Sequence, residues 1–136
     1  MEFIENVFIY GNSKKSQLIN NGFEYVDYIG RSETIEKFDM INIGGYPAIV
    51  PNKHGYKVSG DLYTVGSSQL KDLDQLKGEG VFFDRILGEI YILKNNPRKN
   101  GILVNAWVYV LKDMPETYDE SNIFLTTKNL LTYERI

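Results

Sequence analysis

The stretch LDQLKGEGVFFDR, residues Leu73–Arg85, joins a predicted helix to a predicted strand through a glycine-rich turn. Gly78 follows the last helical residue and is suited to the left-handed backbone that ends many helices. The stretch also gathers charged side chains within a few residues of each other: Asp74, Lys77, Glu79, Asp84 and Arg85. Whether this turn holds a working general base decides most of what the sequence says about function.

The segment SSQLKDLDQLK before this turn is the strongest helix signal in the chain. Leu70, Leu73 and Leu76 recur at helical spacing and are expected to face the core, while Ser67 or Ser68 is suited to cap the start. The segment therefore predicts an amphipathic helix that packs on a sheet.

Most of the remaining sequence alternates or runs apolar in the manner of strands. The expected strands are Asn6–Gly11, Phe23–Arg31, Lys37–Gly45, Tyr56–Gly66, Val81–Leu93 and Ile102–Lys112, with Tyr46–Pro51 as an edge piece between prolines. One or two helical turns are expected over Asn12–Asn20, and a short helix within Asn122–Ile136. The pattern predicts an α+β fold, a closed or nearly closed sheet with short flanking helices.

The expected strand Ile102–Lys112 offers a specific test of the barrel. Trp107 and Tyr109 fall on one face of that strand, and Ala106, Val108 and Val110 fall on the other. We expect the strands to pack inward at alternate positions.

Composition limits the possible functions. The 136 residues correspond to a single domain, and the net charge of −3 argues against nucleic acid or an anionic membrane as partner. The chain has no cysteine and one histidine, His54, so thiol chemistry and a histidine-rich metal site are excluded. Neither a basic signal-peptide start nor an apolar run long enough to span a membrane is present, which predicts a soluble cytoplasmic protein.

Five motifs in order resemble the gamma-glutamylcyclotransferase superfamily. They are VFIYGNSKK (7–15), GYPAIVP (45–51), VSGDLYTV (58–65), LDQLKGEGVFFDR (73–85) and AWVYV (106–110). The resemblance covers roughly residues 6 to 112 and implies a small mixed β-barrel with flanking helices. It further implies a pocket at the loop after the first strand, and a reaction that needs no cofactor.

In active members a glutamate in the LDxxEG position takes a proton from the α-amine of a gamma-glutamyl substrate. The freed amine attacks the side-chain carbonyl, closes 5-oxoproline and expels an amine or amino acid. Such a reaction requires one carboxylate within reach of the amine and donors for the oxyanion. An enzyme of this kind would carry out acyl-transfer or lyase chemistry.

Carried over residue by residue, the resemblance places Tyr10, Gly11, Asn12 and Ser13 in the pocket loop. Ungapped alignment puts Lys77 where the family has its catalytic glutamate. Glu79 lies two residues later and would serve as the base only if the turn were rearranged. A solvated cation at the helix end is the alternative interpretation of Lys77, and a solvated turn residue that of Glu79.

Phe83 and Arg85 fall on a tyrosine and an arginine of the family pattern. Arg85 is either an anion ligand or a structural ion-pair partner of Asp84 or Asp61. Lys14 is a further source of positive charge, and Phe83 or Tyr46 a source of aromatic stacking.

Three functions remain open on these residues. The first is a protein whose pocket holds a small anionic ligand at Lys77, with weak cyclotransferase activity. The second is an active cyclotransferase with Glu79 as the base. The third is a protein-interaction module with a vestigial pocket. The position of Lys77 discriminates between the first two, because an amine cannot replace the carboxylate base unless burial pulls its pKa far down.

Overall fold

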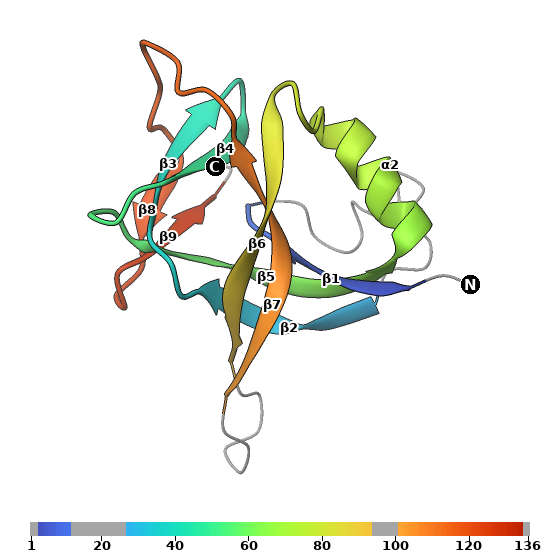
Figure 1. The fold of residues 1–136 in the computed structure, drawn as a ribbon. Coiled ribbons are helices and arrows are strands. Elements are labelled where there is room, and N and C mark those ends of the chain that lie inside the picture. The colour runs from blue at the N-terminus through green and yellow to red at the C-terminus, as the bar shows by residue number, and fades with distance from the viewer. Residues whose placement is uncertain (1–2, 12–26, 94–100, 135–136) are drawn as a thin grey trace.

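The computed structural model describes residues 3–11, 27–93 and 101–134. Its elements follow each other in the order shown in Figure 1. They are β1 (Ile4–Ile9), β2 (Asp27–Thr34), β3 (Phe38–Ile43), β4 (Tyr46–Pro51), β5 (Lys57–Gly66), α2 (Ser67–Lys77), β6 (Phe83–Ile92), β7 (Ile102–Leu111), β8 (Ile123–Leu125) and β9 (Leu130–Tyr133). The predicted helical turns over Asn12–Asn20 lie outside the described residues.

A ring of paired strands forms the centre of the molecule. The strands follow each other in the order β1, β7, β6, β2 and β5, and pairing of β5 with β1 closes the ring. The β1–β7 contact is parallel and the other contacts around the ring are antiparallel. The predicted mixed β-barrel is therefore confirmed, with one helix among the described residues.

Two hairpins extend the barrel on the side away from α2. β3 and β4 form a separate sheet, and β8 and β9 join the barrel through a parallel pairing of β9 with β5 (Figure 1). The β8–β9 hairpin corrects the prediction of a short helix in this part of the chain. Its turn is closed by Asn129, which adopts a left-handed φ of 60° that asparagine tolerates better than most residues.

Strands β1, β5 and β7 of the barrel bury residues on both of their faces. On β7, Ala106, Val108 and Val110 belong to the barrel interior, whereas Tyr109 and Trp107 pack in a second cluster with residues of α2. The predicted division of this strand into two faces is therefore confirmed. β1 alternates in the same way, with Phe8 inside and its neighbours on the helix side.

Helix α2 covers one side of the barrel and runs from the end of β5 toward the start of β6 (Figure 1). Leu70 and Leu73 are buried beneath it, but Leu76 is 57% exposed, so the expectation that all the helix leucines are core is wrong. Leu76 follows Leu70 by two steps of three residues. Because a helix has about 3.6 residues per turn, the Leu76 side chain points about 120° away from the direction of Leu70.

The start of α2 also differs from the prediction. Gly66 is the N-cap residue, where Ser67 or Ser68 was expected. The side chain of Gln69 reaches back and its Oε1 accepts a hydrogen bond from the Gly66 N–H at 2.9 Å. In a capping box, a glutamate or glutamine three residues after the N-cap accepts a hydrogen bond from the N-cap N–H. Gln69 fills this position here.

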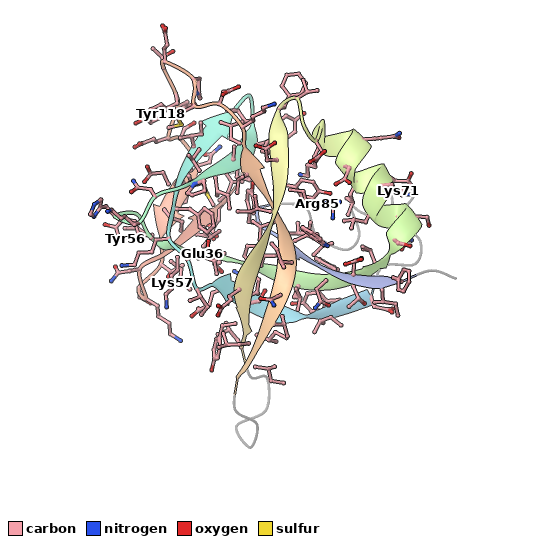
Figure 2. The ribbon with its side chains drawn as sticks, viewed as in Figure 1. Glu36, Tyr56, Lys57, Lys71, Arg85 and Tyr118 are labelled. Carbon is pink, nitrogen blue, oxygen red and sulfur yellow. The ribbon has the colours of Figure 1, made fainter. Side chains whose placement is uncertain are left out.

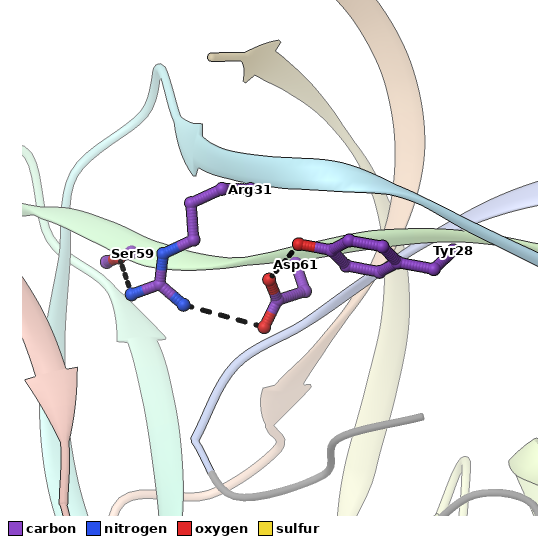
Figure 3. A network of polar contacts seen from close by, with 4 residues as sticks. All are labelled: Tyr28, Arg31, Ser59 and Asp61. Carbon is purple, nitrogen blue, oxygen red and sulfur yellow. Dashed lines mark hydrogen bonds and ion pairs between the residues drawn. The ribbon is translucent and has the colours of Figure 1, made fainter. Parts of the chain in front are cut away.

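A polar network lies on the outer surface where β2 pairs with β5 (Figure 3). Arg31 and Asp61 are register partners, and their Nη1 and Oδ2 lie 3.5 Å apart. Arg31 Nη2 donates to Ser59 Oγ at 2.8 Å, and Tyr28 donates its hydroxyl to Asp61 Oδ1 at 2.9 Å. Burial and the hydrogen bond and charge of Asp61 raise the pKa of Tyr28 to about 12. These exposed contacts join the strands.

Gly11, directly after Tyr10, has two reasons to be glycine. Its φ of +85° lies in the region that other residues rarely adopt. A Cβ placed on it would lie 2.4 Å from Cγ of Pro47. The chain after β1 therefore passes close against β4, and the start of the predicted pocket loop is held there.

Replacing Gly11 with alanine is expected to destabilise the fold through both effects. Gly80→Ala is the matched control, because Gly80 has a φ of +83° and no atom within 4 Å of the added Cβ. Gly80→Ala should cost about 1–2 kcal/mol of unfolding free energy, and Gly11→Ala about 1–3 kcal/mol more through overpacking. Urea denaturation measures both variants, and equal losses would contradict the Pro47 contact.

Candidate functional site

The end of α2 is fixed by a hydrogen-bonded cap. Gly78 has a φ of 63°, and its N–H donates to the carbonyl of Gln75 at 3.2 Å. The N–H of Glu79 donates to the carbonyl of Asp74 at 2.9 Å. This pair of bonds is a Schellman motif with Gly78 as its left-handed residue, as the sequence predicted. The backbone of Lys77, the last helical residue, is therefore held in one place.

Lys77 lines a small cavity between the helix and the barrel. The other lining residues are Phe8, Ile9 and Tyr10 on the chain of β1, and Tyr109 on β7. The cavity itself has a volume of about 10 Å³, enough for about one water molecule, and it opens to solvent at its mouth. Lysine, aromatic rings and aliphatic groups thus make up its described wall, which contains no carboxylate.

The two tyrosines of this wall use their hydroxyl protons within the protein. Tyr10 donates to the backbone carbonyl of Tyr109 at 2.5 Å, and Tyr109 donates to Oδ1 of Asp74 at 2.7 Å. Burial raises the pKa of both hydroxyls well above their ordinary value. For Tyr109 the hydrogen bond and charge of Asp74 add to this effect. Both tyrosines therefore stay neutral at physiological pH.

Lys77 lies in a less polar environment than an ordinary surface lysine. Its side chain is partly buried, and desolvation lowers the pKa of its amine. Burial has this sign because it penalises the charged form of an amine. Within the described part of the chain, no hydrogen bond or ion pair of the Lys77 side chain offsets that penalty.

Asp74, one turn before Lys77, ties the helix to the barrel. Its Oδ1 accepts the Tyr109 hydroxyl and lies 2.9 Å from Nε of Arg85 on β6. The Arg85 contact is an ion pair without the geometry of a hydrogen bond, since the buried Nε has no hydrogen-bond partner. Figure 2 shows Arg85 between the β6–β7 hairpin and the helix. Its expected partners, Asp84 and Asp61, were wrong.

The same arginine stacks on an aromatic ring. The guanidinium carbon of Arg85 lies 4.2 Å from the ring centroid of Trp107, whose Nε1 donates to Oε2 of Glu5 at 3.0 Å. Stacking of this kind stabilises a cation in addition to its ion pair.

The structure separates the two candidate residues of the turn. Lys77 lines the cavity, whereas Glu79 is exposed and is not one of the lining residues. Glu79 nevertheless lies near enough for its charge to make the smallest of the contributions that raise the pKa of Tyr109. Lysine, and not glutamate, therefore stands beside Tyr10.

The other predicted site residues that the structure describes do not line this cavity. Phe83 packs against the cluster of apolar side chains beneath α2, and Arg85 is engaged by Asp74. Tyr46 is 68% exposed, next to the Pro47 that packs on Gly11. The predicted ligand residues Asn12, Ser13 and Lys14 lie outside the described residues.

Sequence reasoning did not assign Tyr109 or Asp74 to the site. Tyr109 was correctly predicted to share a face of β7 with Trp107, but nothing in a single sequence says that α2 covers this face. Asp74 was noticed as a charge three residues before Lys77. A spacing of three residues puts both side chains on one helix face, and this was the available signal.

Two features are absent from the described part of the chain: a metal-binding group and a membrane-spanning helix. It contains no group of three or more aspartate, glutamate or histidine side chains close enough to hold a metal ion. It also contains no helix with the length and apolar character needed to cross a membrane.

Comparison with known proteins gives a consistent family. Gamma-glutamylaminecyclotransferase C of Danio rerio is 28% identical over 120 residues, covering 76% of this chain and 73% of that protein. AIG2-like protein A of Arabidopsis thaliana is 28% identical over 121 residues, covering 88% of this chain and 70% of that protein.

The fold has known counterparts as well. The crystal structure of an AIG2-like protein from Mus musculus superposes with a TM-score of 0.70 at 22% identity, over 98% of this chain and 97% of that one. The model of the family described as "Gamma-glutamyl cyclotransferase, AIG2-like" matches residues 7–127. The chain belongs to this family of gamma-glutamyl cyclotransferase, AIG2-like proteins.

Proposed function

We propose that this protein binds a small molecule with an anionic group at Lys77, and that its cyclotransferase turnover is weak. The observation that carries the proposal is the position of Lys77 on the cavity wall, where the family pattern has its glutamate, together with the exposed position of Glu79. Exchange of a carboxylate for an amine reverses the local charge and with it the preferred ligand charge.

The described wall favours a small anion with an apolar part. The hydroxyl protons of Tyr10 and Tyr109 are donated within the protein, so these residues offer aromatic surface more than free donors. Arg85 is neutralised by Asp74 and adds no free charge. A ligand carboxylate or phosphate would therefore interact mainly with the Lys77 ammonium, and the net charge of −3 disfavours long polyanions.

The same exchange disfavours cyclisation. Closure of 5-oxoproline requires that the α-amine of the substrate lose a proton to a base in the pocket. In its protonated form Lys77 accepts no proton and repels the ammonium group of a gamma-glutamyl substrate, and in its neutral form it carries no negative charge to hold that ammonium group. General base catalysis commonly contributes about 10²–10⁴-fold, so only residual turnover is expected without it.

A second candidate function has one observation in its favour. The charge of Glu79 contributes to the raised pKa of Tyr109, a residue of the cavity wall. In an active cyclotransferase Glu79 would act as the base after a change in the turn that follows α2. This change would have to disrupt the Schellman bond from the Glu79 N–H to the Asp74 carbonyl.

The binding proposal predicts a charge-dependent affinity at one lysine. Calorimetry with phosphate and a series of small mono- and dicarboxylates should detect binding to the wild type and a loss of about tenfold or more in Lys77→Glu. The magnitude follows from one charge-assisted hydrogen bond of about 1.5–3 kcal/mol. Lys71→Glu is the matched control, because it makes the same charge change at an exposed position of the same helix.

Equal affinity of wild type and Lys77→Glu would contradict the anion proposal. An equal loss in Lys71→Glu would assign the effect to overall charge, since long-range attraction depends on net charge and ionic strength and not on one contact.

The turnover proposal predicts a gain of function. Release of 5-oxoproline from gamma-glutamyl dipeptides and gamma-glutamyl amines should be weak in the wild type. It should rise in Lys77→Glu, because this change restores a carboxylate at the cavity, by up to the roughly 10²–10⁴-fold that a general base supplies.

The control for that assay is Glu79→Gln. Strong wild-type turnover that is lost in Glu79→Gln and kept in Lys77→Ala would refute the proposal. It would establish Glu79 as the base and the protein as an active cyclotransferase.

A further inference from the structure

We propose that Lys77 is a carbonyl-capturing amine, which condenses reversibly with a small aldehyde or ketone at the open mouth of the cavity lined by Phe8, Ile9, Tyr10 and Tyr109. The inference deepens the proposed function, on which it rests for the position of the ligand at Lys77. It adds the chemical class of that ligand, a small carbonyl compound that also carries a carboxylate.

The first reason is the environment of the amine. Three other described cationic groups have partners: Arg85 pairs with Asp74, Arg31 with Asp61, and Lys112 Nζ donates to the Gly80 carbonyl at 2.8 Å. Lys77 stands in a wall of aromatic and aliphatic groups, and its side chain makes no hydrogen bond or ion pair with the described residues. Amines used as nucleophiles toward carbonyl groups commonly lie in such desolvated pockets.

The second reason is the protonation state that this environment favours. Desolvation lowers the pKa of Lys77, so the neutral and nucleophilic form of its amine is more populated than in an exposed lysine. The ammonium form attracts the carboxylate of the ligand, and the neutral form attacks its carbonyl. One amine thus serves both steps.

The third reason is that the backbone carrying the amine is held in place. The Schellman bonds fix the backbone of Lys77, and the Tyr109–Asp74 hydrogen bond fixes the facing wall. A lysine whose backbone and facing wall are fixed loses less freedom when the ligand reacts than a lysine on a mobile surface.

The condensation balances without any further reagent. The nitrogen lone pair forms a bond to the carbonyl carbon, and the π electrons move to oxygen to give a carbinolamine. The two protons of the neutral amine leave with that oxygen as one molecule of water, which gives the imine. The open mouth of the cavity lets this water exchange with solvent.

Reductive trapping tests the inference on the wild-type chain. The protein is incubated at neutral pH with cyanoborohydride and either glyoxylate, which carries a carboxylate, or propionaldehyde, which does not. Peptide mass mapping then compares the initial rate of modification at Lys77 with that at Lys71, which is exposed on the same helix (Figure 2).

Lys77 should be modified at least about threefold faster than Lys71 by both aldehydes, as expected for a desolvated nucleophilic amine. Equal or slower modification of Lys77 by both aldehydes would overturn the inference. Faster modification by glyoxylate alone would also overturn it, because attraction of the carboxylate would then explain the rate. Anion affinity at Lys77, measured separately by calorimetry, tells whether the proposed function fails with the inference or survives it.

Discussion

The carboxylate and carbonyl of Asp74 connect the helix to the barrel, and the geometry of the site depends on them. The carboxylate accepts the Tyr109 hydroxyl and pairs with Arg85, while the backbone carbonyl accepts the N–H of Glu79. Such pairing and hydrogen bonding compensates a carboxylate that is partly withdrawn from water. One residue thereby sets the position of α2 over β7, the end of the helix, and the direction of the chain that leaves it.

This arrangement explains why two neighbouring charged residues have such different surroundings. Lys77 precedes the left-handed Gly78 and lies against Tyr10 and Tyr109, whereas Glu79 follows it and is exposed. Because the helix end is fixed by hydrogen bonds, exchanging the two would require breaking the cap. The wall of the cavity between helix and barrel therefore carries an amine.

The barrel could be predicted from the sequence because its strands obey a simple periodicity. Alternation in Ala106–Val110 separated interior from helix-side residues correctly, and Gly78 marked the helix end through the backbone that it permits. Leu76 was misjudged because leucines three residues apart drift around a helix. The C-terminal hairpin was missed because short apolar segments do not distinguish strand from helix by themselves.

The site was less predictable because it is built by contacts between distant segments. The motifs placed Lys77 at the pocket, but the Tyr109–Asp74 bond joins residues 35 positions apart, and the Trp107–Glu5 bond residues 102 apart. Partner choice at such separations depends on strand order and helix placement. For the same reason Asp84, adjacent to Arg85 in sequence, was an incorrect guess for its partner.

The central claim is that the amine of Lys77 is held in the pocket away from bulk water. A heteronuclear NMR titration of the lysine side chains tests it most directly, with the Lys77 signal assigned by its loss in Lys77→Arg. The account predicts a midpoint below the ordinary lysine value of 10.5. A midpoint at or above 10.5 would show a solvated or ion-paired ammonium and would contradict the account.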